Sequence, residues 1–480
     1  MMKKGWLIIL IGVLLAGCRE YTISDDPALR LSFSRDTISF DTVFTEQGSA
    51  TFRLMVYNQN KSALLIRSIG LDENKYFSLN IDGEQKPENL TDLQINGGDS
   101  LFVFVRVHIN PTGENNPVLV SNNLHFYLSS GAKQSVHLEA YGQDVTRIKN
   151  DNPGDHRVTC DTYTFTAEKP YLIFDTLIVS SQLTIEPGAT IYMHNGACII
   201  ALGDVTAVGN LTQPILIRGD RLDNLFDSVP YLYAGGSWDG IYLIADHAST
   251  YTLDYVDILS GTVGLYCYGP SSGTLPTLQM NGCRIHNHTL YGVVLTNTNA
   301  VVTNTEISNC ASYCVYCSGG EHEFIHSTIA SYFGNTNIRI QPTLKEDVAA
   351  VYINNLQKQE PQTISSFRNC IITGYLTNQL VVATPFDRYY PGTFIGNYLK
   401  TDTLHIPHAE KNTYWQPTDT TDVFRNDYYK YKEYHYYDFR LDSLSPAIGI
   451  GDSLTAVPYS TDRMGTSRAL CLPDAGAYQH

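Results

Sequence analysis

Apolar and polar residues alternate in a repeated block between Leu253 and Tyr332. Four copies of the block align on one isoleucine, with spacings of 27, 22 and 22 residues, and a fifth copy follows after an insertion. The five anchors are Ile258, Ile285, Ile307, Ile329 and Ile372. The residue two positions before each anchor is small or β-branched, and the residue between is polar in four of the five copies. This alternation predicts a strand with one face inward and one face outward.

A second short strand is expected six to eight residues after the anchor, at 264–267, 292–295 and 314–317. Gly and Asn separate the two strands, where the chain must turn. A period of 22 residues indicates a solenoid or an array. The leucine-rich repeat pattern is absent, and a propeller blade needs about 40 residues. A right-handed parallel β-helix fits best, with turns stacked about 4.8 Å apart.

The region 29–143 has a different pattern, with apolar alternating segments every 10–15 residues and Gly, Asn and Asp between them. This spacing predicts an all-β sandwich. We expect a polar linker over 144–160, the β-helix over 161–420 and a C-terminal cap over 421–480. A cap is needed because the last turn of a solenoid exposes its core and its backbone groups. The predicted fold class is therefore all-β.

The first residues have the features of a targeting segment. Lys3 and Lys4 precede an apolar run that is too short to span a bilayer. The run ends in the letters LAGC, which resemble the lipobox of bacterial lipoproteins and place the lipidated cysteine at Cys18. We therefore expect a signal peptide over 1–18, a tether over 19–28 and a membrane partner through acyl chains on Cys18.

The residues after Cys18 bear on which membrane is used. Residue 19 is Arg rather than Asp, which disfavours retention in the inner membrane. Glu20, Asp25 and Asp26 resemble the acidic surface-export signal of Bacteroidetes lipoproteins. We expect a cell-envelope protein of the outer membrane, with its surface as one possible side.

Longer segments carry a family resemblance. VYNQNKSALLIRSIGL, INGGDSLFVFVRVHINP and VHLEAYGQD resemble the immunoglobulin-like modules of secreted Bacteroidetes proteins. PYLIFDTLIVSSQLTIEPGATIYMHNGACIIALGDVTAVG and FIHSTI resemble right-handed parallel β-helix lipoproteins of the same phylum. That family has no assigned catalytic residues. The resemblance therefore implies a fold and a location in the cell envelope, and it identifies no catalytic residue in this chain.

Charge narrows the class of partner. The 480 residues contain 48 acidic and 32 basic side chains, a net charge of −16. Nucleic acid needs a basic surface for its phosphates, so we expect no nucleic-acid partner. We also expect no cofactor.

Three cysteines in the segment NCASYCVYC, which ends at Cys317, have a spacing that could hold an iron–sulfur cluster. Buried thiols in a repeat pack as small apolar groups, and Cys283 and Cys370 occupy equivalent positions in their copies. We therefore expect a packed interior. Nine cysteines remain besides Cys18, an odd number, so at least one thiol should be free if all disulfides are intramolecular.

Candidate catalytic and metal-binding residues lie around the fourth copy. His322 and His326, with carboxylates nearby, have the donor types that zinc prefers, although a polar exterior explains them as well. Glu321 and Glu323 share a strand face, as a pair of glycosidase carboxylates would. The segment before the fifth copy holds the best candidates for the catalytic base of a lyase, although neither fits that role well. These are Arg339 and Lys345. We assign neither a catalytic set nor a metal.

Aromatic residues are the stronger functional hint, since the chain has 33 tyrosines. Exposed Tyr and Trp rings can stack on sugars while their polar tips form hydrogen bonds. The glycan-stacking candidates are Trp415, Tyr428, Tyr429, Tyr431, Tyr434, Tyr436 and Tyr437, and the alternative is an aromatic cap. The leading hypothesis is a non-catalytic envelope protein that binds polysaccharide or a surface protein. The alternatives are a polysaccharide lyase or glycoside hydrolase, and a purely structural surface protein.

Overall fold

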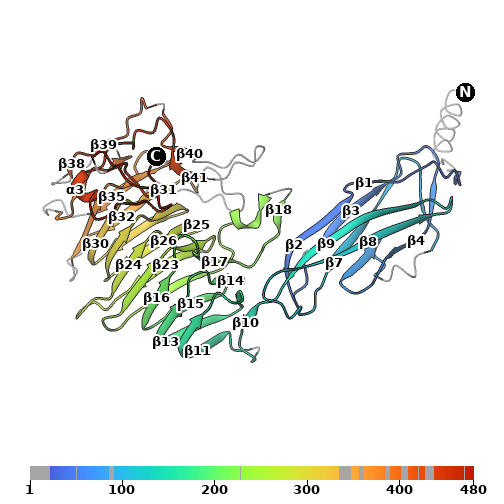
Figure 1. The fold of residues 1–480 in the computed structure, drawn as a ribbon, viewed down its shortest axis with the longest axis horizontal. Helices are drawn as coiled ribbons and strands as arrows, with labels where there is room; N and C mark the ends of the chain where they lie inside the picture. Colours follow the sequence, from blue (N-terminus) through green and yellow to red (C-terminus); the bar gives the residue numbers. More distant parts are fainter. Residues whose placement is uncertain are drawn as a thin grey trace, which may run out of the picture. The chain divides into compact units, whose positions relative to one another are not determined.

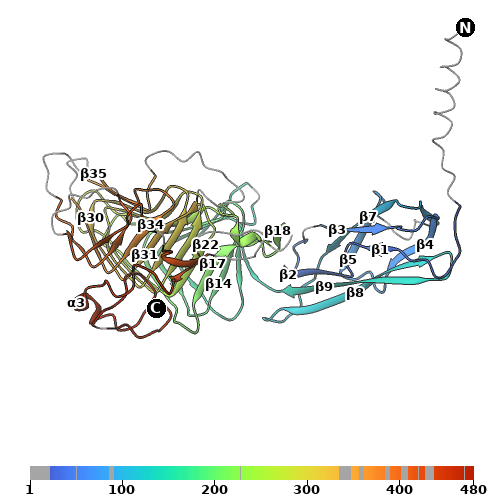
Figure 2. The same ribbon diagram turned by 90° about the horizontal axis from the view of Figure 1, so that it is seen from above.

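The computed structural model divides the chain into two compact units, Met1–Asp144 and Val145–His480, each described here by itself (Figures 1 and 2). Within them the structure describes residues 22–49, 51–85, 91–152, 154–226, 229–333, 348–355, 362–383, 390–401, 409–419, 421–426, 437–469 and 471–480. The expected signal peptide and Cys18 lie outside these ranges. In the described ranges no helix has the length and apolar character needed to cross a membrane.

The first unit is a β-sandwich. One sheet has the order β1-β3-β7-β5 and the other β2-β9-β8-β4-β6. Alternate residues of both sheets form one buried core, which includes Ile38, Leu54 and Phe126. The prediction of an all-β sandwich is confirmed. The strands are β1 (Ser32–Phe33), β2 (Thr37–Phe44), β3 (Phe52–Tyr57), β4 (Leu64–Leu71), β5 (Phe77–Ile81), β6 (Leu93–Ile95), β7 (Ser100–Val107), β8 (Val118–Leu128) and β9 (Lys133–Gln143).

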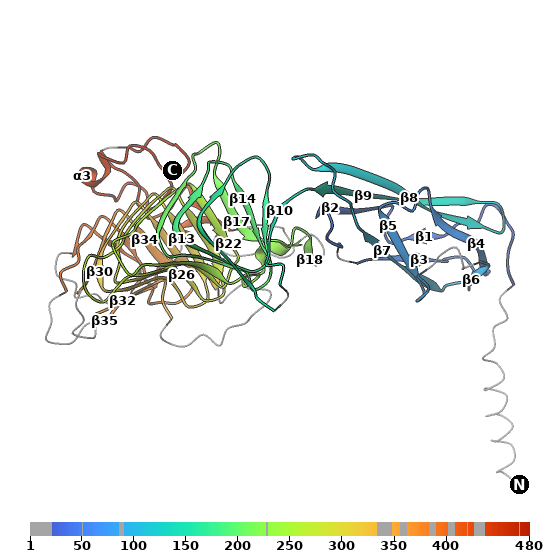
Figure 3. The same cartoon turned by 90° about the horizontal axis from the view of Figure 1, so that it is seen from below.

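The second unit is a parallel β-helix whose turns are stacked one beside the next (Figures 1 and 3). One wall is an 11-stranded parallel sheet. Its strands are β10 (Thr146–Ile148), β12 (Tyr171–Ile173), β14 (Thr190–Met193), β17 (Ile215–Gly219), β22 (Val256–Leu259), β25 (Arg284–His288), β28 (Glu306–Cys310), β31 (Thr328–Ser331), β34 (Ile371–Gly374), β37 (Tyr398–Leu399) and β39 (Thr413–Tyr414).

A 17-stranded sheet forms the rest of the solenoid. Its strands are β11 (Arg157–Phe165), β13 (Thr176–Ile185), β15 (Cys198–Ala201), β16 (Asp204–Val208), β20 (Gly240–Ile244), β21 (Thr250–Asp254), β23 (Val263–Tyr268), β24 (Thr277–Asn281), β26 (Tyr291–Thr296), β27 (Asn299–Thr303), β29 (Tyr313–Ser318), β30 (Gly320–Ile325), β32 (Val351–Asn354), β33 (Thr363–Arg368), β35 (Leu380–Ala383), β36 (Phe394–Ile395) and β38 (Ala409–Glu410). A typical turn consists of β25, β26 and β27. These strands pair in parallel with β28, β29 and β30 of the next turn, respectively. The predicted two or three strands per period are therefore three.

The anchor isoleucines form one continuous ladder inside the 11-stranded sheet. Ile258, Ile285, Ile307, Ile329 and Ile372 are consecutive register partners, and each side chain is fully buried. The ladder continues beyond the sequence repeat, to Ile217 before it and to Leu399 after it. The register therefore extends over turns in which the repeat is too degenerate to recognise.

Shortening one anchor should have a measurable but moderate effect. Ile307→Val removes one methyl group from the fully buried ladder. We expect the free energy of unfolding to fall by about 1 kcal/mol, because neighbouring turns cannot close the gap. Val301→Ala, at an outward position that is 38% exposed, is the matched control and should change little. Chemical denaturation of both variants checks this, and equal losses would contradict the ladder.

Each turn bends at the residue three positions before the anchor, where the backbone is left-handed. Asn304 has φ of 47°, His326 of 46° and Asn369 of 54°. Asn adopts this conformation more readily than most residues because its short side chain bonds locally. The predicted Gly and Asn turn signals therefore mark real corners. His326, one of the candidate metal ligands, is therefore a corner residue.

The outer face of the 11-stranded sheet differs from expectation. Alternation correctly directs the residue before each anchor outward, but Glu306 is 2% exposed and Thr328 is 1% exposed. The described part of the C-terminal segment, residues 437–469 and 471–480, covers them. Tyr478 donates a hydrogen bond to Glu306, and the Ala477 N–H donates to the Thr328 hydroxyl. These residues face outward as alternation predicts but are closed to solvent, because another part of the chain replaces water there.

The remaining elements are short. In the second unit, β18 (Asn224–Phe226) pairs with β19 (Val229–Pro230), and a 3-10 turn follows at η2 (Tyr231–Tyr233). β40 (Phe424–Asn426) pairs with β41 (Asp438–Leu441), and α3 (Ser453–Ala456) is a single helical turn. Phe424, Phe439 and Tyr478 belong to a cluster that packs the C-terminal segment onto the solenoid.

Candidate functional site

Six tyrosines gather on the outer face of the 17-stranded sheet, and we call this set the tyrosine strip. They are Tyr242, Tyr266, Tyr291, Tyr313, Tyr316 and Tyr352. Two register pairs form its ends, Tyr242 with Tyr266 and Tyr316 with Tyr352. Val294 is the register partner between the two pairs. The strip therefore runs across the strands, from one turn of the solenoid to the next.

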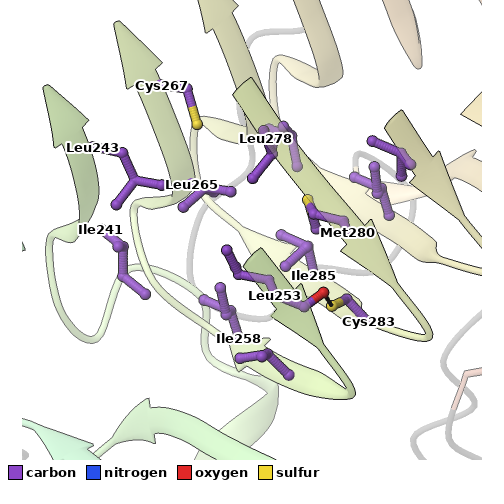
Figure 4. Close-up of a cluster of buried hydrophobic side chains, with 14 of the residues drawn as sticks. Ile241, Leu243, Leu253, Ile258, Leu265, Cys267, Leu278, Met280, Cys283 and Ile285 are labelled. Carbon is purple, nitrogen blue, oxygen red and sulfur yellow. Dashed lines mark hydrogen bonds between the residues drawn. The ribbon is translucent and has the colours of Figure 1, made fainter. Parts of the chain in front are cut away.

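Strand alternation places the strip outside. Leu265 and Cys267 of β23 point into the solenoid core together with Ile241 and Leu243 of β20 (Figure 4). Tyr266 lies between two inward residues, so it must face outward. It is half-buried, as are the other five strip tyrosines. The rings are therefore partly accessible while their inner edges rest on the sheet.

The rings lie against one another along the solenoid. The Tyr316 and Tyr352 rings are 5.8 Å apart between centroids and 2° from parallel, and the Tyr291 and Tyr313 rings are 6.1 Å apart and 10° from parallel. The Tyr242 and Tyr266 rings are 5.9 Å apart and tilted by 40°. Each ring covers part of its neighbour, so the outer surface consists of ring edges, partial faces and hydroxyl groups.

Two hydroxyl groups of the strip have polar partners. Tyr242 donates to Asp239 Oδ1 at 3.2 Å, and Tyr316 accepts from the Asn354 side-chain amide at 3.0 Å. Burial, together with the charge of Asp239, raises the pKa of Tyr242 above its usual range. A neutral phenol can both donate and accept a hydrogen bond, which suits it to another hydroxyl group.

Three exposed apolar side chains extend the strip on its flank. Tyr268 is 42% exposed, and its register partner Ile244 is 36% exposed. Leu202, directly after β15, is 37% exposed. Tyrosines with an adjoining apolar row form the kind of contiguous surface that marks an interaction site.

Of the predicted glycan-stacking residues, Tyr437 is buried and Trp415 is partly buried. Tyr437 is 9% exposed, and its ring stacks on Phe439 at 5.7 Å. Trp415 packs against the same cluster, and the Lys400 ammonium lies 4.7 Å from its ring centroid. Both rings pack against the C-terminal cluster, away from the tyrosine strip, and we do not include them in the candidate site. The other five predicted residues, Tyr428, Tyr429, Tyr431, Tyr434 and Tyr436, lie outside the described residues.

The candidate metal ligands have separate environments. The His322 Nδ1 is 2.9 Å from Ser365 Oγ, and the His326 Nε2 is 3.1 Å from the Asn369 amide. Burial lowers the pKa of His322 to about 4 and that of His326 to about 2, so both are neutral. Within the described ranges no group of three or more His, Cys, Asp and Glu side chains is arranged to hold a metal ion.

The candidate carboxylates lie on the outer face of β30. Glu321 is exposed, and Glu323 forms an ion pair with Arg368 at 3.4 Å. A glycosidase pair needs one carboxyl group with a raised pKa, usually created by burial. Glu323 is instead half-exposed and paired with a cation. Arg339 and Lys345 lie outside the described residues.

The cysteines are packing residues. All nine that follow Cys18 lie in described ranges and are free thiols, and seven are buried. Burial raises the pKa of Cys283, Cys317 and Cys370 to about 12 in each case. A protonated thiol is a poor metal ligand and a poor nucleophile. The segment that ends at Cys317 therefore forms part of the packed interior, as expected.

A hydrogen-bonded relay occurs in the sandwich. The His125 Nδ1 is 2.7 Å from Ser135 Oγ, and its Nε2 is 2.6 Å from Asp72 Oδ1. Acyl transfer would also need donors aimed at an oxyanion. His125 and Ser135 are directly opposite on β8 and β9, whose backbone N–H groups are engaged in the strand ladder. We interpret the relay as a brace between strands.

A buried ionic cluster joins the C-terminal segment to the solenoid. Glu306 accepts hydrogen bonds from Ser308 at 2.7 Å and from Tyr478, and the Arg284 Nε lies 3.3 Å from its carboxylate. Arg463 contacts Asp257 at 2.5 Å, two turns before Glu306 in the solenoid. Burial opposes ionisation of Glu306, but Arg284 and the other cations outweigh it and lower its pKa to about 2. This carboxylate is closed to solvent, so its role is structural.

Sequence reasoning found the strands that carry the strip but not the strip itself. The second strand of each copy was expected at 264–267 and 314–317, and Tyr266 and Tyr316 occupy the same position within them. The available signal was a tyrosine placed between two apolar residues. That pattern becomes informative only when the register is known, because Tyr352 follows an insertion.

Comparison with known proteins gives no assignment. No family model matches the chain, and no curated protein matches it. Among solved structures, the VesB protease of Vibrio cholerae is 14% identical over 23% of this chain and 31% of its own length, with a TM-score of 0.18. A protein of unknown function from Porphyromonas gingivalis W83 is 14% identical over 28% of this chain and 57% of its own, with a TM-score of 0.19.

A family 123 glycoside hydrolase from Clostridium perfringens is 6% identical over 29% of this chain and 30% of its own, with a TM-score of 0.20. The chain spans less than a third of the length of the first two structures matched, the VesB protease and the secreted serine protease VesC of Vibrio cholerae. Likenesses of this size carry no functional argument. The conclusion from structure is a two-unit, all-β chain with a parallel β-helix and a tyrosine strip on its outer face.

Proposed function

We propose that this chain is a non-catalytic, lipid-anchored cell-envelope protein that binds a polysaccharide through the tyrosine strip. The observation that carries the proposal is the row of half-buried tyrosines on the outer face of the solenoid. A tyrosine offers an apolar ring to the C–H faces of a sugar and a hydroxyl group to its polar groups. The lipobox-like segment and the resemblance to Bacteroidetes β-helix lipoproteins support the anchoring part.

Charge favours a neutral polymer over an acidic one. The chain has a net charge of −16, and the strip hydroxyl of Tyr242 faces the Asp239 carboxylate. A uronate or sulfate group near this carboxylate would be repelled. The proposed ligand is therefore an uncharged glycan.

Affinity electrophoresis tests the proposal. The full chain, kept in detergent, should migrate more slowly through native gels cast with one or more neutral polysaccharides. The double variant Tyr266→Ala and Tyr316→Ala should migrate as it does in gels without polymer. Tyr141→Ala, at a 41% exposed tyrosine of the sandwich, is the matched control and should remain retarded.

The possible outcomes are distinct. Retardation lost only in the strip variant supports binding through the strip. A cleared track behind the protein would mean that the protein depolymerises the glycan. It would then be an enzyme, and the proposal of a non-catalytic protein would be wrong. Unchanged migration in every polymer would contradict polysaccharide binding.

A further inference from the structure

We infer that the strip takes a linear, extended, uncharged glycan laid along the solenoid axis, with successive sugars on successive turns. This inference rests on the proposed function and specifies the form and direction of its ligand. The alternative arrangement, in which a polymer follows one strand, would use the residues of a single turn.

The direction follows from register. Tyr242 and Tyr266 are partners on β20 and β23, and Tyr316 and Tyr352 are partners on β29 and β32. Val294 of β26 joins the two pairs. The aromatic surface therefore spans five consecutive turns. Along any one strand, by contrast, outward positions are two residues apart, so a single strand presents few rings.

The repeat distance matches an extended sugar chain. Neighbouring strands lie about 4.8 Å apart, and the strip rings are 5.8 to 6.1 Å apart between centroids within the two most parallel pairs. A chain of equatorially linked pyranoses advances by about one strand spacing per sugar. A helical glycan curves away from a straight row. The geometry therefore selects extended chains over coiled ones.

The contact with each sugar is shallow. Tyr316 and Tyr352 are 2° from parallel, so each ring covers part of the face of the other. No single ring offers a complete free face within these pairs. Affinity must therefore accumulate over several turns, as it does when weak binding units are linked. The site should respond to ligand length and to a break in the middle of the row.

Titration calorimetry with defined oligosaccharides tests this inference. The probes are linear β-1,4-linked glucose, mannose and xylose oligomers of two to six sugars, with maltohexaose as the coiled comparison. For the series that binds, the full chain should show affinity rising at least about tenfold from two to six sugars. Maltohexaose should bind more weakly than the extended hexamer of glucose.

Position along the row gives a second readout. Tyr316→Ala interrupts the row, whereas Tyr242→Ala only shortens it from the β20 end. The first change should weaken hexamer binding by about tenfold, and the second by about threefold or less. Both variants should keep the circular dichroism spectrum of the unaltered chain and remain folded at the assay temperature, because neither side chain belongs to the interior of the solenoid.

Each outcome decides the inference. Affinity that does not depend on oligomer length, or equal losses of affinity in the two variants, would overturn the axial arrangement. If the protein were still retarded in polymer gels, the proposed function would remain supported. Absence of binding by every oligomer, together with unchanged migration in every gel, would overturn both. A length-dependent affinity with a larger loss at Tyr316 would support both.

Discussion

Replacing Glu306 by alanine is expected to lower the free energy of unfolding by about 3–5 kcal/mol, because it removes the buried partner of an ion pair and leaves the partly buried Arg284 without its counter-charge. Glu306 is 2% exposed and accepts hydrogen bonds from Ser308 and Tyr478. Arg284 is its nearest cation, at 3.3 Å, and Arg463 pairs with Asp257, which lies two turns before Glu306. Without the carboxylate, Arg284 loses its partner and Tyr478 of the C-terminal segment loses its hydrogen-bond acceptor.

Two further variants separate charge from packing. Glu306→Gln keeps the shape and can still accept a hydrogen bond, so it should lose most of the same stability if charge is the cause. Glu323→Gln is the control, because its ion pair with Arg368 is about two-fifths exposed on both sides and should contribute about 1 kcal/mol or less. Urea unfolding measures all three. A loss of under about 1 kcal/mol in both Glu306 variants would contradict the role of the cluster.

Acidification from pH 7 to pH 5 should lower the free energy of unfolding by on the order of 2 kcal/mol for each of four buried histidines. Burial lowers the pKa of His286 to about 3 and those of His288 and His322 to about 4. It lowers the pKa of His326 to about 2. One ring nitrogen of each has no hydrogen-bond partner among the described residues, which agrees with a neutral ring.

The sign follows from proton uptake. The folded values lie below the ordinary value of 6.5, so below that pH the unfolded chain binds protons that the folded chain does not. Stability is therefore lost as pH falls from about 6.5 towards 4. Glu306 acts in a lower window. Its stabilisation is present above its ordinary value of 4.5 and is lost as pH falls towards 2.

Thermal unfolding at several pH values measures this dependence. His322→Gln is a useful variant, because it removes the titrating group and retains a side chain that can bond Ser365. Its stability should depend less steeply on pH between 6.5 and 5 than that of the unaltered chain. His156→Gln, at a side chain that is 78% exposed, is the control. A flat profile between pH 7 and 5 in the unaltered chain would show that the buried histidines do not control acid stability.

The sequence predicted the solenoid well because one strand per turn is under strong constraint. The anchor isoleucines must fill the interior, so only a large apolar residue is stable there, and their spacing reveals the turn length. The corner positions could also be predicted from the sequence, since a left-handed backbone favours Gly and Asn. The sandwich followed from alternation, but no residue in it indicated a partner.

Long-range packing explains what the sequence did not reveal. Glu306 and Thr328 looked like outward residues, and only the folded chain brings Tyr478 and Ala477 over them, 172 and 149 residues away. The tyrosine strip was hidden for a related reason. Its members are neighbours through register across an insertion, so their spacing in the chain is irregular.

Hydroxyl-radical footprinting of the full chain, read by mass spectrometry with and without a polysaccharide that retards it, tests the central claim most directly. We predict slower oxidation of Tyr242, Tyr266 and Tyr316 when the polymer is bound. Tyr127 and Tyr141 of the sandwich, 40% and 41% exposed, should react at an unchanged rate. Protection confined to the sandwich or to the β30 face of Glu321, with the strip unaffected, would contradict the assignment of the tyrosine strip as the binding site.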